Sequence, residues 1–215
     1  KIVRTRKKEF QARTVVLAAG AYPRKTGVEG EDRFAGRGVA YCAACDGMFY
    51  KDKTVAVYGG GNSAVEDALL LSRICKKVYL IHRRDTLRAT KVYQDALFGS
   101  SVELVWNSRV TAFLGDKHLS GVEIDDTKTG EKRELSLDGI FVSIGRIPDT
   151  GLFEGQVDMD EAGYLIADET TRTNLPGVFA AGDVRTKQLR QVITAAAVGA
   201  AAAWDAEQYL GEEGC

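Results

Sequence analysis

The segment TVAVYGGGNSA, residues 54–64, carries the clearest indication of fold in this sequence. A compact apolar run of strand length leads into three consecutive glycines. After the glycines, apolar residues recur at the spacing of one helix face: Ala64, Ala68, Leu71 and Ile74. A second apolar run, KVYLIHRR at 77–84, then follows. A strand, a glycine turn, a helix and a strand within about thirty residues form a βαβ unit, so the sequence predicts a parallel sheet.

The glycine turn has the spacing of a dinucleotide-binding loop, Gly59-x-Gly61-x-x-Ala64, with alanine in the third glycine position. The first glycine permits a sharp turn, and the second leaves space for a pyrophosphate against bare backbone. The small third residue lets the helix lie near the sheet, and the helix N-terminus offers unpaired N–H groups to phosphates. The position of the glycines between a strand and a helix strengthens this weak motif. We expect five residues to bind a nucleotide: Gly59, Gly61, Asn62, Ser63 and Ala64.

The residues at the end of the second strand indicate which nucleotide this site binds. An NAD site requires Asp or Glu about twenty residues after the glycines, to bind the ribose hydroxyls. This chain has His82, Arg83 and Arg84 there, and Arg88 shortly after. Guanidinium groups bind a 2′-phosphate through charge-assisted bidentate bonds, whereas a carboxylate would repel it. The four residues therefore favour NADPH over NADH; the alternative is a solvated basic strand end.

A pair of cysteines lies in YCAACDGMFY, residues 41–50. Cys42 and Cys45 have the spacing of a redox-active disulfide, of half a zinc site, or of two buried small residues. Zinc requires four ligands, and the other candidates are isolated in the sequence: Cys75, Cys215, His82 and His118. We therefore favour a redox pair. Asp46 is placed to exchange a proton with a thiol, although an Asp before Gly47 is also common in turns.

A nicotinamide and a disulfide do not exchange electrons directly, so a flavin is expected between them. GVFAAGDV, residues 177–184, is a candidate strand that ends at Gly182 and Asp183, where a carboxylate can bind hydroxyls. Arg190 and Gln191 then open an alanine-rich helix whose N-terminus would stabilise a reduced flavin. These four residues are our candidate FAD contacts.

Composition limits the class of protein. The chain has 215 residues, 45% of them hydrophobic, and a formal charge of −1 with both signs interleaved, so no nucleic-acid footprint is visible. The longest apolar stretch, 193–204, is shorter than the ~20 residues of a membrane helix. Four cysteines are too few for a secreted disulfide framework. We expect a cytoplasmic protein, with Cys75 buried and Cys215 a free tail thiol.

Further elements follow from the pattern. Residues 2–18 predict a hairpin with a charged turn at 7–9. Short strands are predicted at 102–106, 110–114, 119–125 and 139–145, with a hairpin turn at 126–134. A helix is predicted from about Gln191 to Tyr209.

Together, YCAACDG, GGGNSA, HRRDTLRA, IGRIPDT, GVFAAGDV and RQVITAAAVGAAAA resemble the bacterial-type, low-molecular-weight thioredoxin reductases over about residues 10–210. The resemblance implies a homodimeric α/β flavoprotein with a Rossmann-like NADPH domain inserted into an FAD domain. It implies that Cys45 adjoins the flavin, that Cys42 exchanges with thioredoxin, and that Asp46 donates a proton.

The chain departs from that family at its start. The family begins with a strand–Gly-x-Gly-x-x-Gly–helix unit for the ADP half of FAD, and reading from Lys1 we find none. We expect an incomplete FAD domain at 1–25 and 149–215, and an NADPH domain with the Cys-x-x-Cys pair at 26–148. FAD retention and turnover by this chain alone are therefore expected to be weak.

Two other functions remain open. The reductase component of a peroxiredoxin system shares these motifs and carries extra N-terminal domains. A non-catalytic NADP-binding module is the alternative outside enzymes.

Overall fold

The computed structural model describes residues 1–212, which form two compact units. The central unit is Pro23–Gly145. The terminal unit combines Lys1–Tyr22 with the chain from Arg146 onward. Cys215 lies outside the described residues.

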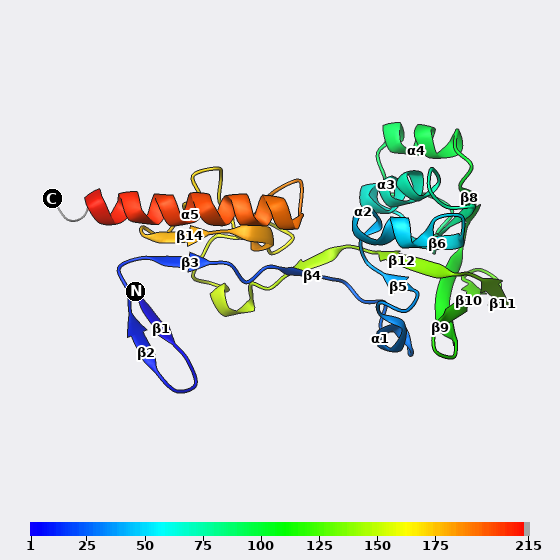
Figure 1. The fold of residues 1–215 in the computed structure, drawn as a ribbon, viewed down its shortest axis with the longest axis horizontal. Helices are drawn as coiled ribbons and strands as arrows, with labels where there is room; N and C mark the ends of the chain where they lie inside the picture. Colours follow the sequence, from blue (N-terminus) through cyan, green and yellow to red (C-terminus); the bar gives the residue numbers. More distant parts are fainter. Residues whose placement is uncertain (213–215) are drawn as a thin grey trace. The chain divides into compact units, whose positions relative to one another are not determined.

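The central unit is built on a five-stranded sheet in the order β5-β12-β6-β7-β8 (Figure 1). Every pairing in this sheet is parallel, as the βαβ unit predicts. The strands, in that order, are Val39–Ala40, Gly139–Ser143, Thr54–Gly59, Lys77–Ile81 and Glu103–Val105. All carboxyl ends therefore meet at one edge, where ligands bind in such folds.

Two hydrophobic clusters cover the two faces of this sheet. Val55 and Val57 pack with helices α3 (Asn62–Leu71) and α4 (Lys91–Phe98), while Ala56 faces the other cluster. The second cluster includes an antiparallel sheet of β9 (Ser108–Gly115), β10 (Leu119–Asp126) and β11 (Lys132–Ser136). Burial on both faces explains why the central strands are apolar runs rather than alternating patterns.

Most elements of the central unit agree with the sequence predictions. Helix α3 buries Ala64, Ala68 and Leu71, but it ends at Leu71, so Ile74 lies beyond it. Cys75 is a free, half-buried thiol packed against the first cluster, and burial raises its pKa. Four helical segments were not predicted: α1 (Glu31–Phe34), α2 (Ala43–Asp46), the 3₁₀ turn η1 (Gly47–Tyr50) and α4. Three of them are single turns, too short for a periodic pattern to reveal.

The terminal unit has three two-stranded pairings. The predicted N-terminal hairpin is formed by β1 (Ile2–Arg4) and β2 (Glu9–Gln11), so its second strand is shorter than expected. The expected continuation, β3 (Val15–Leu17), instead pairs in parallel with β14 (Val178–Ala180), because its apolar residues are covered there. The third pairing joins β4 (Ala21–Pro23) and β13 (Arg146–Pro148).

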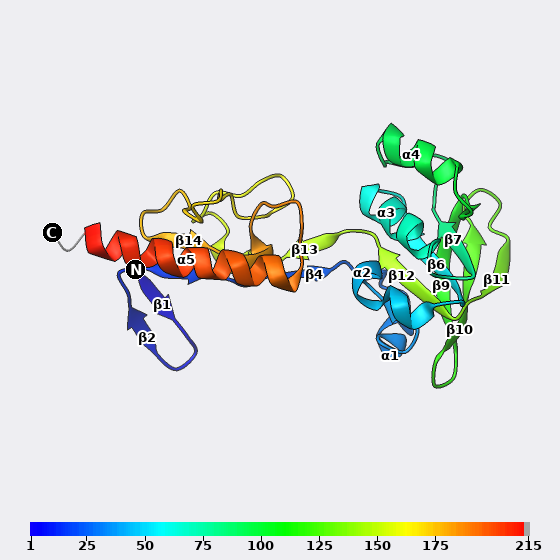
Figure 2. The same cartoon turned by 45° about the horizontal axis from the view of Figure 1, so that its top comes forward.

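The predicted C-terminal helix is α5 (Val192–Glu212), which packs on β14 through a cluster that includes Phe179 and Ala202 (Figure 2). Two 3₁₀ turns complete the unit: η2 (Gly151–Phe153) and η3 (Gly182–Val184). Among residues 1–212, no helix combines the length and apolarity needed to cross a bilayer.

Candidate functional site

The glycine turn brings three elements into close contact. A Cβ atom on Gly59 would lie 2.2 Å from the carbonyl oxygen of Ser143 and 2.7 Å from Cβ of Ala64. Gly59 is therefore required by the approach of β12 and α3 to β6, rather than by the sharp turn we expected. A Cβ atom on Gly61 would meet nothing within 4 Å, so the backbone there faces open space.

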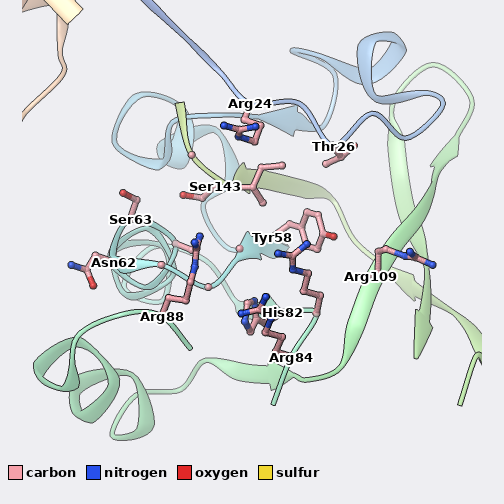
Figure 3. A pocket seen from close by; sticks show the side chains of 17 residues that line it. Arg24, Thr26, Tyr58, Asn62, Ser63, His82, Arg84, Arg88, Arg109 and Ser143 are labelled. Carbon is pink, nitrogen blue, oxygen red and sulfur yellow. The ribbon is translucent and has the colours of Figure 1, made fainter. Parts of the chain in front are cut away.

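An open cleft of about 940 Å³ lies over this turn (Figure 3). All of its lining belongs to the central unit, and none of the lining residues is acidic. Its walls contain every nucleotide residue that the sequence predicted: Gly59, Gly61, Asn62, Ser63, Ala64, His82, Arg83, Arg84 and Arg88. The structure therefore brings these nine residues together in the wall of one cleft.

Other cleft residues escaped sequence analysis. They include Arg24, Thr26, Tyr58, Arg109 and Ser143, labelled in Figure 3. Tyr58 belongs to β6 of the βαβ motif, directly before Gly59, whereas the other four come from segments outside the motif, and no spacing rule links them to it. With Arg24 and Arg109 the cleft has five arginines. Arg109 is bound to Asp125 of β10 at 2.7 Å, which partly neutralises its charge.

The backbone that carries the arginines is held by its neighbours. Ser108 N–H donates to the carbonyl of His82 at 2.9 Å, and Asn107 N–H donates to that of Arg84 at 3.2 Å. Arg88 N–H donates to the carbonyl of Gly60 at 2.7 Å, which ties the arginine loop to the glycine turn. The guanidinium groups therefore project from a fixed frame.

His82 supports the glycine turn. Its side chain is buried, with Nε2 3.0 Å from the carbonyl oxygen of Thr86. A Cβ atom on Gly60 would lie 2.2 Å from the imidazole, so the ring packs directly beneath that glycine. Burial is the main cause that lowers the pKa of His82, which keeps the ring neutral at pH 7. Asn62 is also engaged locally, because its Oδ1 accepts from Thr90 N–H at 2.8 Å.

Cys42 and Cys45 form a disulfide, with Cα atoms 5.2 Å apart. Cys42 directly precedes α2, and its sulfur accepts from Cys45 N–H at 3.1 Å. The two cysteines are therefore paired with each other, as a redox pair requires, and in this bonded state their sulfurs are not zinc ligands. Among residues 1–212, no group of three or more His, Cys, Asp or Glu side chains could hold a metal ion.

The surroundings of the disulfide differ from the cationic cleft. Cys42, Asp46, Phe49 and Tyr50 line a second cavity of about 370 Å³. Cys45 is more exposed than Cys42. Met48 is 67% exposed and Phe49 75%, so apolar side chains stand beside the disulfide in water.

A buried carboxylate connects the two regions. Glu31 accepts from the N–H and hydroxyl of Thr26, at 2.8 and 2.6 Å, and from the hydroxyl of Tyr41 at 2.9 Å. Thr26 lines the cleft, whereas Tyr41 precedes Cys42 and lines the second cavity. Burial and Glu31 together raise the pKa of Tyr41. A lone Glu in a polar loop gives no signal of this role in the sequence.

The four predicted flavin residues lie together in the terminal unit. Gly182 adopts a φ of +74° at the start of η3, and Asp183 follows it. The guanidinium of Arg190 stacks on the ring of Tyr164 at 4.0 Å. Gln191 N–H donates to Oγ1 of Thr194 at 3.1 Å, immediately before α5 begins.

This region contains buried polar atoms that lack partners among the described residues. They are Asp183 Oδ1, Arg185 Nε, Lys187 Nζ and Arg190 Nε. Burial lowers the pKa of Lys187, which sequence analysis did not identify. Buried polar groups are normally hydrogen-bonded, so these atoms suit a polar ligand such as the flavin of FAD.

Comparison with known proteins places these features in a family. Residues 1–199 match the model of the pyridine nucleotide-disulphide oxidoreductases. A thioredoxin reductase of Streptomyces clavuligerus is 50% identical over 93% of this chain, and one of Peptoclostridium acidaminophilum is 44% identical over 98%. The crystal structure of thioredoxin reductase from Streptococcus pyogenes superposes with a TM-score of 0.91 at 42% identity, covering 98% of this chain and 70% of its own.

The chain spans 63% of the length of the Streptomyces clavuligerus relative and 69% of the Peptoclostridium acidaminophilum relative. Across that length the family match includes the disulfide, the glycine turn and the flavin candidates up to residue 199. The chain therefore belongs to the pyridine nucleotide-disulphide oxidoreductases and, within them, to the thioredoxin reductases.

Proposed function

We propose that this chain passes electrons from NADPH, by way of FAD, to the Cys42–Cys45 disulfide and on to a thioredoxin-like protein. One observation carries the proposal: a disulfide and a cationic glycine-turn cleft occur in one compact unit, Pro23–Gly145. A nucleotide site alone would suit many oxidoreductases, and a disulfide alone would suit a structural role.

The cleft is the proposed NADPH site. The start of α3 and the open backbone at Gly61 would hold the diphosphate. Arg83, Arg84 and Arg88 would bind the 2′-phosphate, and no acidic residue lines the cleft to repel it. Absence of a lining carboxylate also removes the usual ribose contact of an NAD site.

FAD would be held in part by the terminal unit. Asp183, Lys187 and Arg190 offer it the unpartnered polar atoms, and Gly182 and Gln191 complete the predicted set. When bound, FAD supplies a carrier that accepts a hydride and delivers two electrons to sulfur. In domain terms, residues 26–148 would be the NADPH domain, and 1–25 with 149–215 the FAD-domain segments.

The disulfide would then act by thiol exchange. Two electrons and two protons convert Cys42–Cys45 to two thiols, and Asp46 would exchange a proton there. The thiolate of Cys42 would attack the disulfide of the partner, forming a mixed disulfide and releasing one partner thiolate. Cys45 would attack that mixed disulfide, restoring the internal bond and releasing the partner as a dithiol. Met48 and Phe49 offer an apolar contact surface beside these sulfurs.

The expected homodimer and cytoplasmic location belong to this proposal and follow from the family resemblance. The peroxiredoxin-system alternative differs in partner rather than in chemistry. Reduction assays with both kinds of partner separate the two.

The test uses the full chain supplied with FAD under anaerobic conditions. NADPH should bleach the visible absorbance of the bound flavin and create two new thiols per chain from the one disulfide. Oxidised thioredoxin added next should consume both thiols. NADPH binding without new thiols would identify a non-catalytic module and overturn the proposal.

A further inference from the structure

Glu31, the first residue of α1, is a buried acid that lines neither cavity. Its exposed fraction is only 3%, and acidic side chains are rarely buried to this extent unless their oxygens are hydrogen-bonded. Its two carboxylate oxygens bind different segments. Oε2 accepts from the N–H and hydroxyl of Thr26 and, at 3.3 Å, from the N–H of Gly27. Oε1 accepts from the hydroxyl of Tyr41. The proposed electron pathway gives Glu31 no role.

On the Oε2 side, the carboxylate is enclosed by a compact loop. The N–H of Val28 donates to Oγ1 of Thr26 at 3.1 Å, and the N–H of Glu31 donates to the carbonyl of Val28 at 3.3 Å. Val28 also packs against the second hydrophobic cluster. Because three donors bind one charged oxygen, and hydrogen bonds to charged groups are stronger than neutral ones, the carboxylate is a fixed point of the central unit.

On the Oε1 side, Glu31 holds the residue that precedes Cys42. The backbone before Cys42 has little support of its own, because β5 is two residues long and lies at the edge of the sheet. Tyr41 packs against the second cluster, and its hydroxyl reaches Glu31 at 2.9 Å. Cys45 instead lies in α2, whose buried Ala43 packs in the first cluster. The two cysteines are therefore supported from different clusters, and Glu31 secures the side of Cys42.

We propose that Glu31 is a positioning residue of the redox pair, which acts through Tyr41 to keep Cys42 beside Cys45 when their bond is open. The inference rests on the proposed function. Two thiols that are held close together re-form their bond more readily than thiols on a mobile segment, because less entropy is lost on closure. A dithiol that favours closure gives up its electrons more readily. The link to Glu31 therefore makes the pair a stronger reductant of its protein partner.

The test is the equilibrium of the full chain with dithiothreitol. Dithiothreitol gives two electrons and two protons to the Cys42–Cys45 disulfide, and its own two thiols close into a cyclic disulfide. Tyr41→Phe removes the hydroxyl that binds Glu31, so it should raise the equilibrium constant for reduction by about threefold. Alkylation with iodoacetamide followed by mass spectrometry measures the fraction of the pair that is reduced.

Glu31→Asp tests the other end of the link. This variant keeps the negative charge but is one methylene shorter, so it cannot bind Thr26 and Tyr41 together. It should raise the equilibrium constant for reduction by about threefold as well. Because the charge is unchanged, this shift would come from the lost link rather than from repulsion of a thiolate. Wild-type constants in both variants would overturn the proposal.

The variant with both substitutions tests whether Glu31 acts through Tyr41. Its equilibrium constant should match those of the single variants, because each substitution already breaks the same link. Tyr50→Phe is the matched control, since it removes a hydroxyl from the same cavity that is not a donor to Glu31 in the described chain. It should keep the wild-type constant. Shifts that multiply in the double variant, or an equal shift in Tyr50→Phe, would contradict the proposal.

Measurements of stability separate positioning from a purely structural role. Denaturant unfolding of Tyr41→Phe should show a larger loss of stability in the disulfide form than in the dithiol form, because the link favours the bonded state. By the thermodynamic cycle, a threefold shift in the reduction equilibrium corresponds to a difference of about 0.7 kcal/mol between the two losses. Equal losses in both forms would assign the bond a structural role only and refute the inference.

These measurements need neither NADPH nor FAD. An unchanged equilibrium in the variants of a chain that forms thiols with NADPH and FAD would overturn the role of Glu31 alone. A shifted equilibrium in a chain whose disulfide does not respond to NADPH would support Glu31 and overturn the electron pathway.

Discussion

The cleft and the disulfide region lie at the same carboxyl edge of one parallel sheet, yet their chemistry differs. The cleft follows β6, β7 and β12 and is lined by five arginines and no carboxylate. The disulfide follows β5 and is flanked by Asp46 and by exposed Met48 and Phe49. Positive charge suits a small anion, whereas apolar surface suits contact with another protein. One sheet edge therefore offers two sites for two kinds of ligand.

Loss of the disulfide should separate the two regions most clearly. Cys45→Ser should lower reduction of a thioredoxin-like partner by ~1,000-fold or more, because no internal disulfide can re-form. The dissociation constant of NADP⁺, measured by calorimetry, should stay within about twofold, since Cys45 does not line the cleft. A large loss of NADP⁺ affinity in this variant would show that the regions are not separate.

Removal of two cleft arginines is the reciprocal change. Arg83→Ala combined with Arg84→Ala should weaken NADP⁺ binding by ~100-fold, because hydrogen bonds to charged groups contribute about 1.5–3 kcal/mol each. NAD⁺ binding should change far less, since it lacks the 2′-phosphate. Arg133→Ala on β11, exposed and outside the cleft, is the control. Equal weakening for both nucleotides would place the 2′-phosphate elsewhere.

The apolar surface beside the disulfide is tested by substituting Met48 and Phe49 together. Met48→Ser with Phe49→Ser should raise the KM for the protein partner by ~10-fold, as expected for loss of a buried interface anchor. NADP⁺ affinity should not change. Val92→Ser on α4, 79% exposed and outside the lining of both cavities, supplies the control. An unchanged KM would mean that the partner binds another surface.

Ionic strength should distinguish the regions without mutation. Raising salt from about 0.05 to 0.5 M should weaken NADP⁺ binding by about fivefold, because salt screens exposed charge pairs. The KM for the protein partner should change less with salt, because apolar contacts, which salt does not screen, bind the partner. Titrations at several salt concentrations check this. If the KM for the partner rose more than the dissociation constant of NADP⁺, charged rather than apolar contacts would bind the partner.

The smallest effect should come from the link at Glu31. Tyr41→Phe removes one hydrogen bond to this buried carboxylate and should lower the free energy of unfolding by about 1–2 kcal/mol. Because Glu31 also holds Thr26 in the cleft wall, the dissociation constant of NADP⁺ should rise by about twofold. Tyr50→Phe, at the same cavity but without a bond to Glu31, should leave NADP⁺ binding unchanged.

The sequence by itself determined the βαβ unit, the glycine turn and the cysteine pair. Each is local: apolar runs set strands and α3 through periodicity, and glycine or cysteine spacing operates within a few residues. Arg83, Arg84 and Arg88 could also be predicted from the sequence, because they lie at or shortly after the end of the second strand of the same βαβ unit. The short turns α1, α2 and η1 were not, because one helical turn holds too few residues to show a period.

Tertiary structure alone decided which distant residues share a site. Arg24 and Arg109 enter the cleft, and Glu31 connects Thr26 to Tyr41. It also placed Val15–Leu17 beside β14 rather than in the predicted hairpin. Such contacts depend on strand order, register and packing between segments far apart in the chain. Local sequence patterns do not predict these long-range contacts, because the contacts form only when distant segments pack into one core.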